Sequence, residues 1–176
     1  LGQTSTREYL ATLLWEDADP ELARSSLRQA LSALRRALPD DCAHALRADA
    51  QSVWLDADAV TSDVAEFNTQ VRDGSPGAVL ALIERCDEEL LAGLDGRSVS
   101  FEHWAQEQRR AFRRSVVDAL TRIAARCGAA ADRAGQLSAL ERLVALDPLN
   151  EPAQRDLMAL LARVGSVSYR RGLAVS

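Results

Sequence analysis

Basic and hydrogen-bonding side chains recur at steps of three and four near the start of the chain. Because such steps place residues on one face of a helix, these side chains would form a continuous polar stripe. Arginine in such a stripe can pair bidentately with a guanine edge or hold a phosphate, and glutamine can pair with adenine. The pattern predicts a DNA-reading surface, although a solvated helix face would show the same spacing. The residues are Arg24, Arg28, Ser32 and Arg35, with Ser25, Gln29 and Arg36 beside them.

The segment that carries this stripe, residues 20–38, is apolar on its other side. Asp19 suits the N-cap of a helix, Pro20 suits the first helical position, and Pro39 ends the run. The segment therefore predicts one amphipathic helix with a buried face. The residues expected on that buried face are Leu27, Ala30, Leu31, Leu34 and Leu38.

A second, shorter helix is predicted just before it, over residues 6–14. Ser5 and Glu8 have the spacing of a capping box, and leucines follow them at helical steps. The five residues 16–20 then lead into the longer helix. Two helices joined this tightly indicate a helix-turn-helix.

After the longer helix, the period of the sequence changes to that of strands. Residues 45–48 and 52–55 are short β-type runs around 49–51, which predicts a hairpin with Arg47 near its tip. Residues 59–62 are a candidate for a third short strand. Helix, helix and hairpin is the order of a winged helix.

Two stretches of this region carry a specific resemblance to a known family. They are STREYLATLLWEDADPELARSSLRQALSALRRAL and VWLDADAVTSDVAEF. Both are similar to the winged-helix half of the SARP-type (antibiotic regulatory protein) bacterial activators. The resemblance implies that helix 20–38 is the recognition helix of an OmpR-type winged helix. The family pattern has a small N-terminal sheet and a first helix before the region that matches residues 4–15, so we expect a partial winged helix here.

The remainder of the chain is predicted to be helical. A further resemblance lies in the segments LLAGL, FEHWAQEQR and RLVALDPLNEPAQRDLMALLARVG, which are similar to the bacterial transcriptional activator domain. Leu-Asp-Pro-Leu-Asn between two helices is also similar to the connector of tetratricopeptide repeats. A turn is expected at Gly135, and residues 168–176 resemble a later helix of the module. The predicted helices are 63–72, 78–86, 101–131, 136–146 and 151–164.

Together these patterns predict a mainly α protein with two domains. Residues 1–62 would form a partial winged helix-turn-helix with a small β-hairpin, and residues 63–176 an all-α, tetratricopeptide-like domain. One face of the long helix would either pack against a neighbouring domain or be buried in the repeat core. That face carries Phe101, Trp104, Phe112, Val116 and Leu120.

Composition narrows the class of protein. Hydrophobic residues make up 47% of the chain, which indicates a globular protein, and the net charge of −5 counts against nonspecific nucleic-acid binding by the whole chain. Three widely spaced cysteines favour a reducing compartment, and no apolar run approaches the ~20 residues that span a membrane. We therefore expect a cytoplasmic protein. His44 and His103 lie in different segments and no phosphate-binding glycine motif occurs, so we expect neither an enzyme nor a cofactor or metal.

Two functions follow from these observations. The first is a DNA-binding transcriptional regulator that reads the major groove with helix 20–38, aided by Arg47. Its partners would be double-stranded DNA, RNA polymerase and a second copy of the chain on DNA. The alternative is a helical-repeat protein–protein interaction module whose winged helix does not bind DNA. The acidic net charge and the missing first helix favour that alternative.

Overall fold

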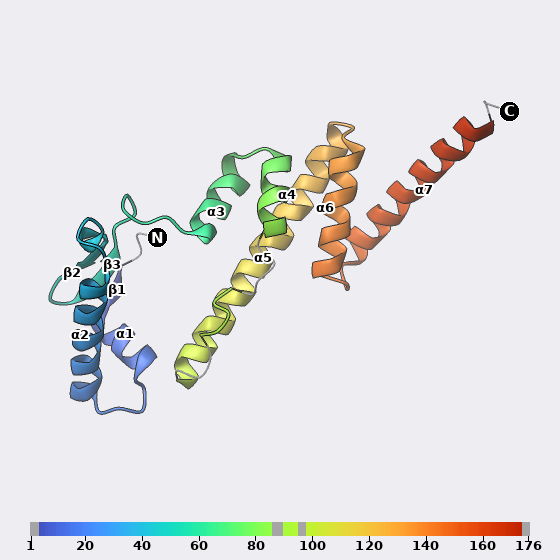
Figure 1. Ribbon diagram of the computed structural model, residues 1–176. Coiled ribbons are helices and arrows are strands. Elements are labelled where there is room, and N and C mark those ends of the chain that lie inside the picture. Colours follow the sequence, from blue (N-terminus) through green and yellow to red (C-terminus); the bar gives the residue numbers. More distant parts are fainter. Residues whose placement is uncertain (1–3, 86–89, 95–97, 174–176) are drawn as a thin grey trace. The chain divides into compact units, whose positions relative to one another are not determined.

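The computed structural model describes residues 4–85, 90–94 and 98–173 of the 176-residue chain. Figure 1 shows a small sheet near the N-terminus followed by helices, which confirms the predicted mainly α fold. The elements are β1 (Ser5–Thr6), α1 (Arg7–Leu14), α2 (Pro20–Ala37), β2 (Leu46–Ala48), β3 (Ser52–Leu55), α3 (Asp63–Asp73), α4 (Pro76–Arg85), α5 (Val99–Ala129), α6 (Arg133–Leu146) and α7 (Glu151–Leu173).

The sheet is antiparallel, with strand order β1-β3-β2. The predicted hairpin is present, with Arg47 opposite Trp54, and its turn is closed by Asp49. The third strand is β1 and not residues 59–62. Asp56 explains this difference, because it accepts hydrogen bonds from the backbone N–H groups of residues 58 and 59 and so turns the chain.

Helix α1 begins at Arg7, one residue later than predicted, because its N-cap is Thr6. The hydroxyl of Thr6, and not that of Ser5, accepts the backbone N–H of Tyr9 at 3.1 Å. Ser5 instead pairs with Val53 in the sheet, so its place in β1 removes it from the capping position. The chain therefore passes from strand to helix without an intervening loop.

One core cluster joins α1, α2 and the hairpin. Its buried members are Ala11, Ala23, Leu27, Leu31, Leu46 and Val53. The predicted apolar face of α2 is correct for Leu27 and Leu31, but Leu34 is 46% exposed and Ala30 is also exposed. The buried stripe follows steps of four from Ala23, so these two residues lie at its edge.

The later helices differ from prediction mainly at their ends. Helix α5 ends at Ala129, and the predicted turn at Gly135 is wrong, because Asp132 caps α6 by accepting the N–H of Gly135 at 3.0 Å. Helix α7 continues through Gly165 to Leu173, so the expected separate helix at 168–176 is also wrong. A glycine weakens a helix by about 1 kcal/mol relative to alanine, and no proline follows Gly165 to stop it. The expected end of a helix at Cys86 lies outside the described residues.

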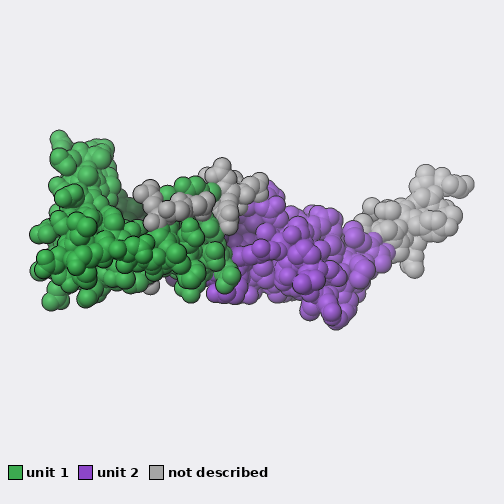
Figure 2. All heavy atoms as spheres, turned by 90° about the horizontal axis from the view of Figure 1, so that it is seen from below, with its two compact units in different colours: residues 1–68, 88–110 green, residues 69–87, 111–176 purple. Residues whose placement is uncertain are grey.

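The chain divides into two compact units, drawn in green and purple in Figure 2. Unit 1 comprises residues 1–68 and 88–110, and unit 2 comprises residues 69–87 and 111–176. Unit 1 has a second apolar cluster in which Leu13 packs with Phe101 and Ala105. The buried side chains of unit 2 come from four helices and include Val79, Leu82, Ile83, Val116, Leu120, Ile123, Leu140, Leu143 and Leu160.

Most of the apolar residues predicted on one face of the long helix are buried. Phe101, Val116 and Leu120 are 8%, 7% and 0% exposed, and Trp104 packs on the Leu13 cluster. Burial inside the two units therefore accounts for most of this face.

Candidate nucleic-acid interface

The predicted polar stripe lies on α2. The helix is 18 residues long, and its start is set by Asp19, whose carboxylate accepts the N–H of Glu21 at 2.9 Å. Pro20 occupies the first turn. Seven of the eight predicted site residues are thereby brought together on one helix. Arg24, Arg28, Gln29, Ser32, Arg35 and Arg36 are exposed, and Ser25 is half-buried.

The stripe faces away from the core because Leu27 and Leu31 anchor the opposite side of α2, at 4% and 9% exposure. Within the described part of the chain, Arg24, Arg28 and Arg35 make no ion pair. Arg36 donates from Nε to the carbonyl of Ser32 at 3.4 Å. The guanidinium groups of this face therefore remain available for an external acceptor such as a phosphate or a base edge.

Arg47, the eighth predicted residue, lies apart from α2 on strand β2. Its guanidinium pairs with the carboxylate of Asp56 at 3.3 Å, with 51% of the arginine side chain exposed. An exposed pair of this kind contributes about 0–1 kcal/mol. Arg47 can therefore exchange Asp56 for an anionic ligand at little energetic cost.

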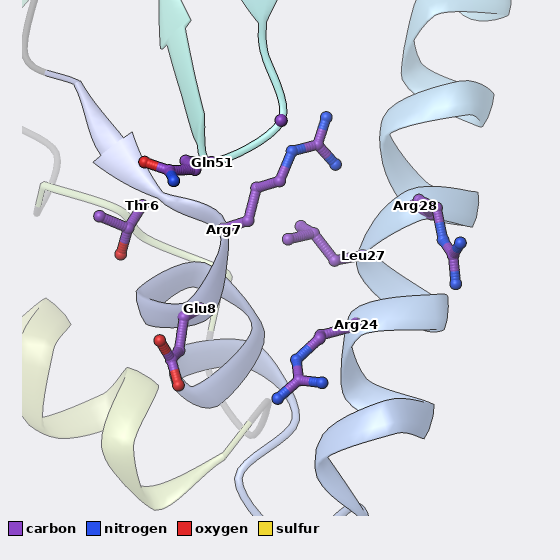
Figure 3. A pocket seen from close by; sticks show the side chains of 8 residues that line it. Thr6, Arg7, Glu8, Arg24, Leu27, Arg28 and Gln51 are labelled. Carbon is purple, nitrogen blue, oxygen red and sulfur yellow. The ribbon is translucent and has the colours of Figure 1, made fainter.

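A groove opens between α2, the start of α1 and the turn of the hairpin. Its volume is about 610 Å³. In Figure 3, Arg7 lies between the hairpin turn and α2, Arg24 extends from α2 into the groove, and Arg28 points outward from α2. The lining residues are Thr6, Arg7, Glu8, Arg24, Leu27, Arg28, Ala50 and Gln51.

Only Arg24 and Arg28 among these lining residues were predicted as site residues, and Arg7 and Gln51 are among those that were not. The backbone N–H of Arg7 donates to the carbonyl of Gln51 at 2.8 Å, next to the β1–β3 pairing, and Arg7 Nε donates to the carbonyl of Asp49 at 2.8 Å. No spacing rule connects residue 7 with residue 51. Only the pairing of β1 with β3 brings them together, and a two-residue strand gives almost no signal in a sequence.

The hairpin turn is held by a carboxylate beside the groove. The pKa of Asp49 lies below its usual value, first because the backbone N–H of Gln51 donates to the carboxylate, then because that of Ser52 does. The positive charge of Arg7 lowers it further. The turn therefore keeps its carboxylate ionised and directed to its own backbone.

The connection between α1 and α2 is fastened to the start of α5, within unit 1. The carboxylate of Glu16 accepts the N–H groups of Val99 and Ser100, at 2.8 and 3.0 Å, and the hydroxyl of Ser100. In return, the hydroxyl of Ser98 donates to the carbonyl of Leu13 at 2.6 Å. The Ser100 hydroxyl bond is the main cause of the lowered pKa of Glu16. Because an anion at a helix N-terminus also neutralises the helix dipole, this contact stabilises both elements.

The described residues contain neither a cluster suited to a metal ion nor a helix suited to crossing a membrane. No group of three or more His, Cys, Asp or Glu side chains there is placed to hold a metal ion. None of the described helices has the length and apolar character to cross a membrane.

The comparisons with known proteins concern the later part of the chain. A search of the curated proteins returned no match. Residues 55–169, which include all helices from α3 onward up to the last turn of α7, match the family described as the bacterial transcriptional activator domain. This match covers more than half of the chain, and the chain therefore belongs to the bacterial transcriptional activator domain family.

Proposed function

We propose that this protein is a DNA-binding transcriptional regulator, similar to the SARP-type activators, that reads the major groove with α2. The observation that carries the proposal is the exposed arginine face of α2, opposite a side on which Ala23, Leu27 and Leu31 are buried in the core. A helix of this length spans roughly 27 Å at 1.5 Å per residue, and the major groove is wide enough to admit it.

The arrangement around α2 supports this role. Helix α1, the connection of residues 15–19, and α2 form a helix-turn-helix, and the β2–β3 hairpin supplies the wing of a winged helix. We assign this DNA-binding domain to residues 1–62 and the helical domain to residues 63–176. In a helix-turn-helix the second helix reads bases while the first crosses the backbone.

The side chains of α2 have distinct tasks in this proposal. Arg24, Arg28 and Arg35 pair with guanine edges or phosphates, and Gln29 pairs with adenine. Ser25, Ser32 and Arg36 supply shorter contacts along the same face. Arg47 on the wing leaves Asp56 to contact the sugar-phosphate backbone.

The helical domain provides the regulatory part of the proposal. Membership of the bacterial transcriptional activator domain family supports a cytoplasmic activator without catalytic activity. Helical repeats present surfaces for other proteins, so RNA polymerase and a second copy of the chain are the proposed partners.

A second candidate function is that of a protein–protein interaction module that does not bind DNA. It is favoured by large apolar side chains at the surface of unit 2: Leu149 is 89% exposed, Met158 64% and Leu161 47%. The net charge of −5 also favours it. Isolated exposed apolar residues are common on soluble proteins, however, so we rank this candidate second.

A selection experiment distinguishes the two functions. The intact protein is used to select duplexes from a random pool of double-stranded DNA, and their Kd is measured at about 50 and 200 mM salt. DNA binding predicts enriched duplexes whose affinity falls steeply as salt rises, and its loss when Arg24, Arg28 and Arg35 are all replaced by alanine. The three side chains are exposed, so this variant should keep its melting temperature. Failure to enrich any duplex would overturn the proposal.

A further inference from the structure

The groove between α2 and the hairpin contains an arginine that is fixed in place. Arg7 Nε donates to the carbonyl of Asp49 at 2.8 Å, and the Arg7 backbone N–H donates to the carbonyl of Gln51 at the same distance. Both acceptors belong to the hairpin turn, which Asp49 closes. A guanidinium held at Nε keeps its plane, so its two terminal amino groups retain a fixed direction.

In Figure 3 the Arg7 side chain runs from the start of α1 past the hairpin turn, and its amino groups point toward α2, while Arg24 points toward the other end of the groove. Two acidic residues are close by. Glu8 lies at the opposite end of the groove from the Arg7 guanidinium, and the carboxylate of Asp49 is occupied by the backbone of its own turn. Asp49 stays ionised and offsets part of the positive charge of Arg7, but its carboxylate is bonded to its own turn, so the terminal amino groups of Arg7 can donate to a ligand.

We infer that the end of the groove at Arg7, named here the notch, binds one phosphate of the DNA backbone through the terminal amino groups of Arg7, beside the major groove entered by α2. This inference rests on the proposed DNA-binding function and adds a contact that lies outside the predicted stripe. Arginine suits a phosphate, because its planar set of N–H donors matches the geometry of the phosphate oxygens. The Arg7 side chain is also held in place by the hairpin turn before a ligand binds. A preformed donor loses less conformational entropy when its ligand arrives.

A phosphate bound in the notch would also fix the position of the β2–β3 hairpin on the DNA. Arg7 bonds to the hairpin turn through Nε and faces the ligand through its terminal nitrogens. A phosphate held there places the hairpin and α2 at a set distance from one strand. Phosphate contacts of this kind orient a protein on the duplex without reading its sequence.

The variant Arg7→Gln separates the bond of Arg7 to the hairpin turn from its proposed contact with a phosphate. Its side-chain amide places an N–H donor at the same number of bonds from the backbone as Arg7 Nε, while the charge and the terminal amino groups are removed. Arg155→Gln, an exposed arginine of α7, is the matched control. Kd is measured for a duplex selected from a random pool and for its scrambled sequence, over a range of salt concentrations.

Loss of one phosphate contact should reduce the slope of log Kd against log salt by about one and weaken both duplexes by the same factor. That factor is roughly eightfold at about 0.1 M salt. It follows from a slope of about 0.9 per phosphate contact over the tenfold change in salt concentration from about 1 M. Arg7→Lys should restore most of the slope, and Arg155→Gln should leave it unchanged. Melting temperatures confirm folding, and Arg7→Met provides a second neutral variant if Arg7→Gln unfolds.

Several results would overturn the inference. A wild-type slope in the neutral variants would remove the phosphate contact while leaving DNA binding intact, and weakening of the selected duplex alone would make Arg7 a base contact. If inorganic phosphate raises the melting temperature through Arg7, at matched ionic strength and without a change in slope, the notch holds free phosphate and not DNA. If the wild type binds no duplex, the proposed function fails and the inference fails with it.

Discussion

Arg28 lies in the middle of the exposed stripe of α2, with the buried Leu27 beside it and Leu31 one turn further along the helix. Its guanidinium has no ion-pair partner among the described residues. Arg28 is therefore the residue at which a base contact and a phosphate contact can be separated most cleanly.

Arg28→Ala should weaken binding of the selected duplex by about 1–3 kcal/mol if Arg28 pairs with a base, and discrimination should relax at one position of the site. A phosphate contact would instead lower affinity for every sequence and reduce the salt slope by about one. Competition binding against single-position variants of the duplex distinguishes the outcomes. Unchanged affinity and slope in Arg24→Ala, Arg28→Ala and Arg35→Ala would favour the interaction-module function.

Ala131 shows how a single residue limits the stability of unit 2. Its φ of 57° lies in the left-handed region, where the N–H groups of residues 131 and 132 donate to the carbonyls of Gly128 and Cys127. This bonding pattern ends α5 as a Schellman motif, in which glycine is the preferred residue at this position.

Ala131→Gly should raise the free energy of unfolding by about 1 kcal/mol, because glycine adopts positive φ without the steric cost of a Cβ. Urea unfolding monitored by circular dichroism measures the change. Ala125→Gly, at an exposed position inside α5, is the matched control and should lower the free energy by about 0.5–1 kcal/mol. Equal destabilisation by both substitutions would show that the left-handed conformation carries no cost.

At the scale of elements, the contact of Glu16 with the start of α5 determines how the helix-turn-helix is held in unit 1. The carboxylate accepts two backbone N–H groups and a hydroxyl from Val99 and Ser100. Next to it, Leu13 packs against Phe101. The turn between α1 and α2 is thus fixed by a charged cap and an apolar contact together.

The Glu16 cap should make stability depend on pH. Its pKa is lowered in the folded protein, mainly by the Ser100 hydroxyl, so its contribution is present above the ordinary value of 4.5 and is lost as pH falls through the lower folded value. Glu16→Gln should therefore lower the melting temperature at neutral pH and have progressively less effect as the medium becomes more acidic. Asp17→Asn, which removes the same charge from an exposed neighbour, is the control. A difference between wild type and Glu16→Gln that stays constant below pH 4.5 would contradict this role.

The elements themselves were largely predictable. Asp19, Pro20 and the spacing of Leu27 and Leu31 were sufficient for α2, and alternating residues around the turn were sufficient for the hairpin. Contacts between distant segments were not predictable, because β1 is too short to leave a pattern and because nothing in the sequence links Glu16 with Ser100. Arg7 was missed for the first of these reasons.

At the scale of the whole molecule, the charge of α2 is opposite in sign to the net charge of the chain. Helix α2 carries four arginines and one glutamate, while the chain has a net charge of −5. An acidic protein with one basic face should bind DNA poorly outside its site, because nonspecific binding depends on total phosphate contact. Specific recognition would then require either good base contacts or two copies of the chain.

We expect two copies on the selected duplex. Equilibrium sedimentation of the intact protein, with and without that duplex, should show a dimer in the DNA complex, since helical repeats present surfaces that associate with a second protomer. A duplex trimmed to a single half-site is the control and should bind one copy. A protein that stays strictly monomeric in both samples, at concentrations well above its Kd for DNA, would contradict the dimer.

The position of α2 in the major groove is tested most directly by methylation interference on the selected duplex. Guanine N7 faces the major groove and adenine N3 faces the minor groove, so methylation at the two atoms reports which groove is read. The expected result is that methyl groups at guanine N7 within the site block binding, and that Arg28→Ala removes the effect at a single guanine. Interference at adenine N3 alone, or at no position, would contradict major-groove reading by α2.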